Sequence, residues 1–343
     1  MQFIKRIAGS SMGWAGVCFY ALAVASMLTL GACRGGAKKT AIPQDTAIPQ
    51  DTTIPQDTTI PQQPTTGGIT YDYYVDAATG ADTNAGTQAA PFKTITHALS
   101  VATSGKTVKV FPGTYNNPGN GEVFPIRIPL GVSLIGDEAN KGAGGTPTLI
   151  TGSGVYGTPA GAISVAVATG DTSTLAGFTV SLPSNYGVVM FDPTGTVRNN
   201  TLTGSFAALT LIASGGGGQL ILNNDIIGNT YGGIWVKGNQ TSQSIAEGNR
   251  ITTSGSGILY DIGGAPTIDF GGGAAGSTGG NAFYCNTKDV NATSLVAADT
   301  VSLRNNYWDH APPTTVDIAN ANGATLDTTS AQVVTALGLT NCP

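Results

Sequence analysis

The chain has 343 residues, of which 10% are charged and 49 are glycine, while 41% are hydrophobic. A charged fraction far below the typical value of about 25% argues against a helix-rich cytosolic enzyme. With 15 basic and 20 acidic residues, the chain offers no basic surface to neutralise phosphates, so we expect no nucleic-acid partner. Two histidines and four cysteines, none in a CxxC spacing, leave little for a metal site of the His/Cys type.

The N-terminus resembles the signal peptide of a bacterial lipoprotein. Two basic residues precede a strongly apolar stretch, which ends in small residues followed by Cys33. This order resembles the lipobox, in which the cysteine is lipidated and becomes the new first residue. The resemblance implies a signal peptide over 1–33 and a membrane anchor at Cys33, and an uncleaved transmembrane helix is the alternative. We expect an extracytoplasmic, lipid-anchored protein, and Arg34 after the cysteine is compatible with export to the outer membrane or cell surface.

Residues 34–68 have the composition of a tether. The hexad AIPQDT at 41–46 recurs twice and then begins again, so a proline occurs every six residues. One aliphatic residue per repeat cannot build a buried face, so we predict a disordered, extended segment that holds the following domain away from the membrane. A partner-binding role for the repeat is the alternative.

From residue 69 onward, a second periodicity predicts an all-β solenoid. An asparagine followed two residues later by a large apolar residue recurs at steps of 24, 25, 32 and 25 residues. The asparagines are Asn200, Asn224, Asn249, Asn281 and Asn306. Short alternating strands joined by Gly/Asn/Thr turns, in units of about 24–25 residues, predict a right-handed parallel β-helix. We expect these asparagines to tolerate left-handed turn geometry and to hydrogen-bond from coil to coil as a ladder.

A solenoid must cap the apolar cross-sections at its two ends. Residues 91–102 place apolar side chains on one helical face, which predicts an amphipathic cap helix within an N-terminal cap over 70–103. The C-terminal cap is expected over 311–343, and the domain of 69–343 is expected to be a monomer. If Cys33 is lipidated and Cys18 lies in the signal, only two cysteines remain. In an oxidising compartment they most simply pair, which predicts a disulfide between Cys285 and Cys342.

Several motifs resemble a bacterial and archaeal surface family of unknown function within the pectate-lyase-like β-helix superfamily. They are YVD at 74–76, PFKTI at 91–95, VKVFPGTY at 108–115 and NNYWDH at 305–310. The resemblance covers about residues 70–310 and implies the fold and its capping. It is a poor guide to chemistry, because a fold does not fix a function.

The repeat alignment predicts a ligand-binding face. It places Met190, Trp235 and Tyr260 in one outward column, and Asp192 and Lys237 in the next, with Asp261 beside them. Coils stack about 4.8 Å apart, so Trp235 and Tyr260 would form an aromatic platform suited to sugar rings. We therefore expect a non-catalytic surface protein that binds polysaccharide through Trp235, Tyr260, Lys237, Asp261, Met190 and Asp192.

Two other functions stay open, a polysaccharide lyase or hydrolase and a purely structural or adhesive surface protein. The alignment brings no three carboxylates to one face, so Lys237 as the base of a lyase is the only catalytic candidate. No cofactor is expected except for calcium, for which Asp76, Asp82 and Asn84 are weak candidates because they offer hard oxygen ligands in one loop. Asp and Asn are also ordinary turn residues.

Overall fold

The computed structural model describes residues 69–158, 161–191, 194–212, 218–237, 243–261, 267–340 and 342. The predicted signal peptide with Cys33, and the predicted tether over 34–68, lie outside these residues. In the described part of the chain, no helix is long and apolar enough to cross a bilayer.

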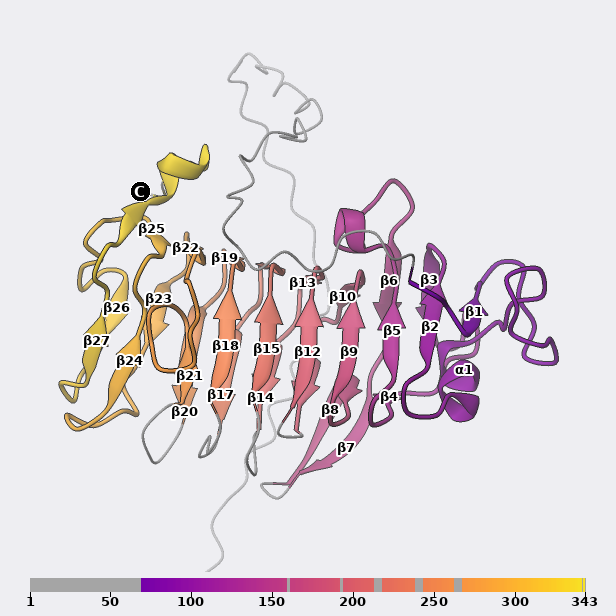
Figure 1. Ribbon diagram of the computed structural model, residues 1–343. Coiled ribbons are helices and arrows are strands. Elements are labelled where there is room, and N and C mark those ends of the chain that lie inside the picture. Colours follow the sequence, from indigo (N-terminus) through magenta and orange to yellow (C-terminus); the bar gives the residue numbers. More distant parts are fainter. Residues whose placement is uncertain are drawn as a thin grey trace, which may run out of the picture. The chain divides into compact units, whose positions relative to one another are not determined.

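Three parallel sheets wind around one axis as a right-handed parallel β-helix, which confirms the predicted fold (Figure 1). The first sheet contains β1 (Tyr73–Val75), β2 (Thr107–Val110), β5 (Ser133–Ile135), β9 (Ser173–Ala176), β12 (Gly195–Arg198), β15 (Gln219–Leu222), β18 (Ser244–Glu247) and β21 (Ile268–Asp269). The second contains β3 (Gly113–Asn116), β6 (Thr148–Thr151), β10 (Thr179–Ser181), β13 (Thr201–Thr203), β16 (Asp225–Ile227), β19 (Arg250–Thr252), β22 (Ala282–Tyr284), β25 (Tyr307–Trp308) and β28 (Gln332–Val333). The third contains β4 (Ile126–Ile128), β8 (Gly161–Thr169), β11 (Tyr186–Met190), β14 (Ala207–Leu211), β17 (Gly232–Lys237), β20 (Ser256–Asp261), β23 (Lys288–Asn291) and β26 (Ile318–Ala319).

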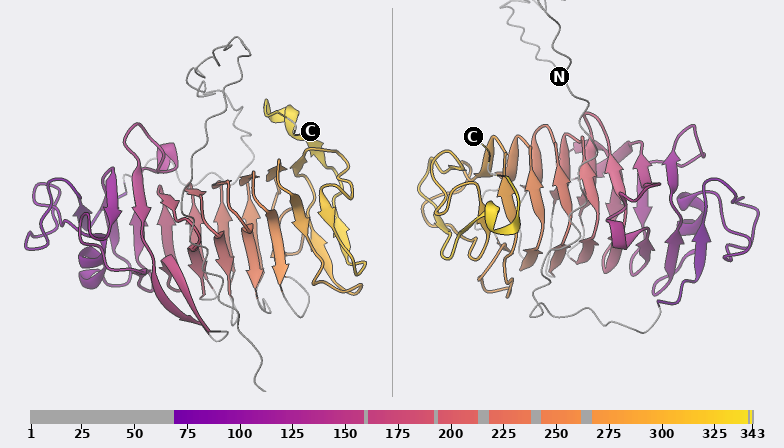
Figure 2. Two further views of the ribbon diagram at one scale, coloured as in Figure 1. Left: turned by 180° about the vertical axis from the view of Figure 1, so that it is seen from behind. Right: turned by 90° about the horizontal axis from the view of Figure 1, so that it is seen from above.

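The remaining elements lie at the ends or project from the coils. Strand β7 (Gly154–Thr158) pairs antiparallel with β8, and β24 (Thr300–Ser302) pairs with β27 (Thr325–Asp327). The helical elements are α1 (Ile95–Val101) and the short 3₁₀ turns η1 (Glu138–Asn140) and η2 (Val334–Leu337). The coils stack in line from α1 at one end to β27 at the other (Figure 1 and Figure 2).

The core consists of columns of apolar side chains that stack from coil to coil. In the second sheet the apolar residue of each predicted repeat pairs with that of the next coil, and all five of these side chains are fully buried. The column is Leu202, Ile226, Ile251, Phe283 and Trp308. Each coil alone exposes its apolar face, so the fold depends on contacts between neighbours.

The predicted asparagine ladder is present and buried. The Oδ1 atom of Asn249 accepts the backbone N–H and the side-chain Nδ2 of Asn224, each at 3.0 Å, and its own Nδ2 donates to Asn281 Oδ1 at 2.9 Å. The same pattern joins the other members of the ladder. The left-handed turn lies one residue earlier than expected, at positions such as Asn223 (φ 54°) and Gly248 (φ 66°). The ladder asparagine therefore supplies hydrogen bonds, and its predecessor supplies the turn.

Helix α1 closes the N-terminal end as the apolar pattern predicted. Ile95, Ala98 and Leu99 are buried, and Thr94 caps the helix by accepting the N–H of His97. Glu122, fully buried, accepts the N–H of Ile95 at 2.6 Å and thereby satisfies another free donor of the first turn.

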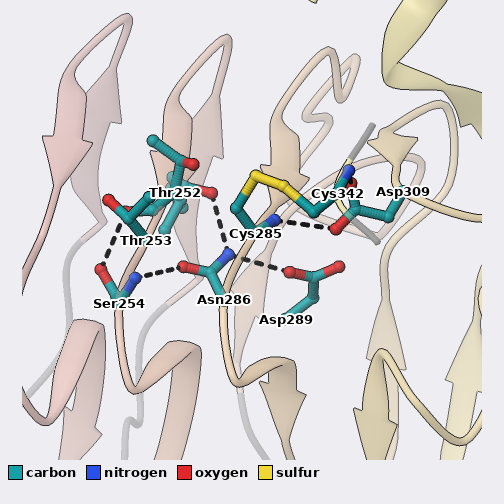
Figure 3. The surroundings of a disulfide bond; sticks show 9 residues. Thr252, Thr253, Ser254, Cys285, Asn286, Asp289, Asp309 and Cys342 are labelled. Carbon is teal, nitrogen blue, oxygen red and sulfur yellow. Dashed lines mark hydrogen bonds between the residues drawn. A yellow bond between two sulfur atoms is a disulfide. The ribbon is translucent and has the colours of Figure 1, made fainter. Parts of the chain in front are cut away.

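The C-terminal end carries the disulfide between Cys285 and Cys342, whose Cα atoms are 5.2 Å apart. It joins the turn after β22 to the end of the chain, as the cysteine count predicted (Figure 3). Closing a loop of this length stabilises a fold by about 4 kcal/mol in the chain-entropy model.

Candidate functional site

Side chains of the third sheet alternate between the core and the outer surface. In β17, Ile234 and Val236 are fully buried in the main core, so Trp235 and Lys237 lie on the outer face. In β20, Tyr260 belongs to the main core and is 1% exposed. The outer face of this sheet is therefore the place to test the predicted binding residues.

The predicted aromatic platform of Trp235 and Tyr260 is wrong. Backbone pairing places Trp235 beside Leu259, and Tyr260 beside Val236. This coil is one residue shorter than the repeat alignment assumed, and a slip of one residue moves a side chain to the opposite face of a sheet. Burial raises the pKa of the Tyr260 phenol, and its hydroxyl has no hydrogen-bond partner among the described residues.

Met190 is misplaced by the same kind of slip. It pairs with Leu211, is fully buried and belongs to the main core, so it cannot contact a ligand on the outer face. Asp192 lies outside the described residues. Of the predicted set, the structure brings Trp235, Lys237 and Asp261 together on the outer face.

Three aromatic residues from three consecutive coils gather around Trp235, and we call these four residues together the aromatic patch. Tyr186 is the first residue of β11, Phe206 and Tyr231 stand just before β14 and β17, and Trp235 lies within β17. The rings of Phe206 and Tyr231 are stacked at 4.7 Å with an interplanar angle of 5°. Tyr186 and Trp235 are stacked at 5.8 Å with an angle of 16°.

Exposure within the aromatic patch is graded. Tyr231 is 43% exposed, Phe206 and Tyr186 are half-buried, and Trp235 is 6% exposed beneath them. The indole N–H of Trp235 has no hydrogen-bond partner among the described residues. Such an arrangement presents apolar ring faces to solvent on a rigid base, since each residue is fixed at a strand or at the start of one.

A lysine and an aspartate flank the aromatic patch. The Nζ atom of Lys237 lies 4.5 Å from the centroid of the Trp235 ring and 4.0 Å from Asp261 Oδ2. Burial raises the pKa of the Tyr186 phenol, and the nearby Tyr231 and the Asp261 carboxylate raise it further. Lys237 offers hydrogen-bond donors and Asp261 offers acceptors next to the exposed rings.

Sequence reasoning missed three members of the aromatic patch. Tyr186, Phe206 and Tyr231 each stand at the start of a repeat block, and this recurrence of aromatic residues was a visible signal. The predicted site follows the column through Trp235 within the strands, whereas these three residues stand at the first position of a strand or just before it.

Each of the predicted calcium ligands makes hydrogen bonds within its own loop. Asp76 accepts the N–H groups of Ala78 and Thr79, and Asp82 accepts those of Lys93 and Thr94. The Asn84 amide donates to the Pro91 carbonyl at 2.8 Å. These are the contacts of turn residues, and calcium binding at this loop stays a prediction.

Comparison with solved structures finds carbohydrate-active enzymes at low identity. The chain is similar to a rhamnogalacturonan lyase, with 15% identity and a TM-score of 0.31 over 69% of this chain and 67% of that chain. It is also similar to a GH136 lacto-N-biosidase from Eubacterium ramulus, with 12% identity and a TM-score of 0.30 over 76% of this chain and 67% of that chain. No curated protein matches.

A family model described as "Protein of unknown function (DUF1565)" matches residues 78–315. The match covers most of the β-helix and includes three of the four motifs on which the resemblance to a family of unknown function rested; the fourth, YVD at 74–76, lies just before it. The chain belongs to the DUF1565 family.

Proposed function

We propose that this protein binds a neutral polysaccharide at the cell surface through the aromatic patch on the third sheet. The observation that carries the proposal is the gathering of Tyr186, Phe206, Tyr231 and Trp235 on the outer face, flanked by Lys237 and Asp261.

Stacked rings suit the flat, weakly polar faces of sugar rings. The ring of Tyr231, which is 43% exposed, is stacked on Phe206 of the neighbouring coil, so the pair offers an apolar surface along the axis of the solenoid. A polymer with repeated sugar units would contact this surface without a deep pocket. Donors of Lys237 and acceptors of Asp261 would then bind sugar hydroxyls at the edge.

The charge distribution favours a neutral polymer over an acidic one. Residues 69–343 contain 10 basic and 17 acidic side chains, so the domain carries a net negative charge of 7. The single lysine of the site is matched by Asp261 at 4.0 Å, so little positive charge is left for a uronate.

Anchoring through Cys33 supports this role, because a lipid-anchored protein keeps its binding face at the envelope surface. Incorporation of labelled palmitate tests the anchor. We expect labelling of the wild-type protein and its loss in Cys33→Ser, and labelling that survives this change would contradict the anchor.

A panel of immobilised neutral and uronate polysaccharides tests the binding. Replacing Tyr231 by alanine should weaken binding to a neutral polymer by at least tenfold, about 1.4 kcal/mol. The matched control is Tyr71→Ala, which removes another partly exposed tyrosine that has a lysine, Lys109, over its ring at 5.5 Å, far along the chain from the aromatic patch. Equal binding by both variants would refute the site.

The lyase alternative rests on Lys237 as a base, and it stays a prediction. The same panel tests it, because a lyase would release unsaturated products that absorb in the ultraviolet, and Lys237→Ala would abolish them. A protein that neither binds nor cleaves any member of the panel would favour the structural or adhesive alternative.

A further inference from the structure

Three buried aspartates meet at the C-terminal end of the solenoid, far from the aromatic patch in sequence. Asp289 lies in β23, Asp309 directly follows β25, and Asp317 directly precedes β26. Carboxylate oxygens from the three side chains all lie within 4.8 Å of one another, and the residues are 1%, 8% and 4% exposed. The repeat alignment did not foresee this convergence, because the three residues occupy different positions of their coils.

Two of the three carboxylates are held in place by hydrogen bonds. Asp309 accepts the N–H of Cys285 at 2.8 Å and the N–H of Cys342 at 3.0 Å, so the disulfide positions it (Figure 3). Asp317 accepts the N–H of Thr314 at 2.6 Å and its hydroxyl at 3.0 Å, and it pairs with His310 Nδ1 at 2.8 Å. Both oxygens of Asp309 and the Oδ1 atom of Asp317 accept one hydrogen bond each, so each of these three keeps a further lone pair for a ligand.

The third carboxylate has an oxygen without a partner. Asp289 Oδ1 accepts the Asn286 amide at 2.8 Å, but Oδ2 is buried and has no hydrogen-bond partner among the described residues. Figure 3 shows this second oxygen pointing away from Asn286, to the side on which Asp309 lies. Leaving a charged oxygen buried and unpaired is costly, so this atom indicates that a positively charged ligand belongs here.

Cationic side chains do not offset the three charges. In the described part of the chain, His310 is the one cationic group in contact with these carboxylates, and its side chain is 46% exposed. Lys288, next to Asp289, donates instead to the carbonyls of Thr315 and Val316.

We propose that Asp289, Asp309 and Asp317 bind one calcium ion. Carboxylate oxygens are ligands that calcium prefers, and a divalent ion would offset two of the three negative charges. Oxygens that bind the same calcium ion lie at most about 4.6–5.2 Å apart, twice the usual metal–oxygen distance, and one oxygen from each of the three side chains lies within 4.8 Å of the others. The remaining ligands would be carbonyl oxygens and water.

Calorimetric titration of the full chain, stripped of metal by a chelator, tests the site with calcium chloride as the probe. We expect one bound ion and a rise in melting temperature of roughly 5 °C at saturation. Asp289→Asn should weaken binding at least tenfold and remove most of the thermal shift. The matched control, Asp299→Asn, changes a buried aspartate outside the cluster and should keep the affinity within about twofold.

The replacement of Asp289 by a neutral isostere removes a buried charge, so the variant should fold. If it does not, Asp317→Asn takes its place with the same expected loss. The site is refuted if wild type shows neither calcium binding nor a thermal shift, or if Asp289→Asn and Asp299→Asn bind calcium equally. Stronger binding of magnesium than of calcium under the same conditions would overturn the identity of the ion.

Discussion

Replacing Asn249 by alanine tests the ladder that joins neighbouring coils. Its side chain is 1% exposed and has partners on both sides. Its Oδ1 atom accepts two hydrogen bonds from Asn224, and its Nδ2 atom donates to the Ile221 carbonyl at 2.8 Å and to Asn281 Oδ1 at 2.9 Å. Alanine supplies none of these contacts.

The expected loss of stability follows from the hydrogen-bonding groups that the substitution leaves without partners. The backbone N–H of Asn224 and one side-chain N–H of the same residue are left buried without an acceptor, and each such donor costs about 1–3 kcal/mol. Loss of the bonds from Nδ2 adds to this, so we expect the free energy of unfolding to fall by about 3–5 kcal/mol.

Urea unfolding monitored by circular dichroism measures this change, and hydrogen exchange locates it at the Asn224 amide, which should lose protection. The matched control is Asn223→Gly, one residue from the ladder, where glycine keeps the left-handed turn and only an exposed hydrogen bond to Asn199 is lost. We expect a change below about 1 kcal/mol for the control. A fall below 1 kcal/mol for Asn249→Ala, or an equal fall for both variants, would refute the reasoning.

Three other changes test the core, the pH response and the calcium site. Tyr260→Phe removes a buried hydroxyl that has no partner among the described residues, so thermal unfolding should show stability raised by about 1 kcal/mol, with glycan binding unchanged; a clear loss of stability would contradict this. Burial opposes ionisation of Glu138, but hydrogen bonds from Arg198 and Asn199, together with the positive charges of Arg198 and Lys109, outweigh it and lower the pKa. This carboxylate therefore stabilises the fold above its ordinary pKa of 4.5, and the effect is lost as the pH falls through the lowered value. Stability curves should thus fall more steeply with acid for wild type than for Glu138→Gln, and parallel curves would contradict the ion pair. Joint replacement of Cys285 and Cys342 by serine should weaken calcium binding, because their N–H groups position Asp309; unchanged affinity by calorimetry would show that the bridge has no such role.

The parts of the fold that depend on periodicity could be predicted from the sequence. A buried asparagine needs a partner in the next coil, and an apolar residue two positions later needs a column to join, so both recur at the length of a coil. The disulfide between Cys285 and Cys342 could be predicted from the expectation that the other two cysteines, Cys18 and Cys33, belong to an N-terminal signal.

The candidate site was harder to predict, because successive side chains of a strand point to opposite faces of the sheet. The coil containing Tyr260 is one residue shorter than the alignment assumed, which was enough to move this ring from the expected surface to the core. The aspartates of the cluster, Asp289, Asp309 and Asp317, do not follow the sequence repeat. The cluster forms where strand β23 meets the irregular segments after β25 and before β26, and a periodic pattern holds no information about such segments.

Fluorescence of Trp235 tests the proposed binding face most directly. The chain has three tryptophans, so Trp14→Phe and Trp308→Phe together leave Trp235 as the single emitter. Titration with a neutral oligosaccharide that the intact protein binds should change the emission of Trp235 saturably, and the change should disappear when Tyr231 is also replaced by alanine. Binding with an unchanged Trp235 spectrum would place the ligand elsewhere and contradict the account.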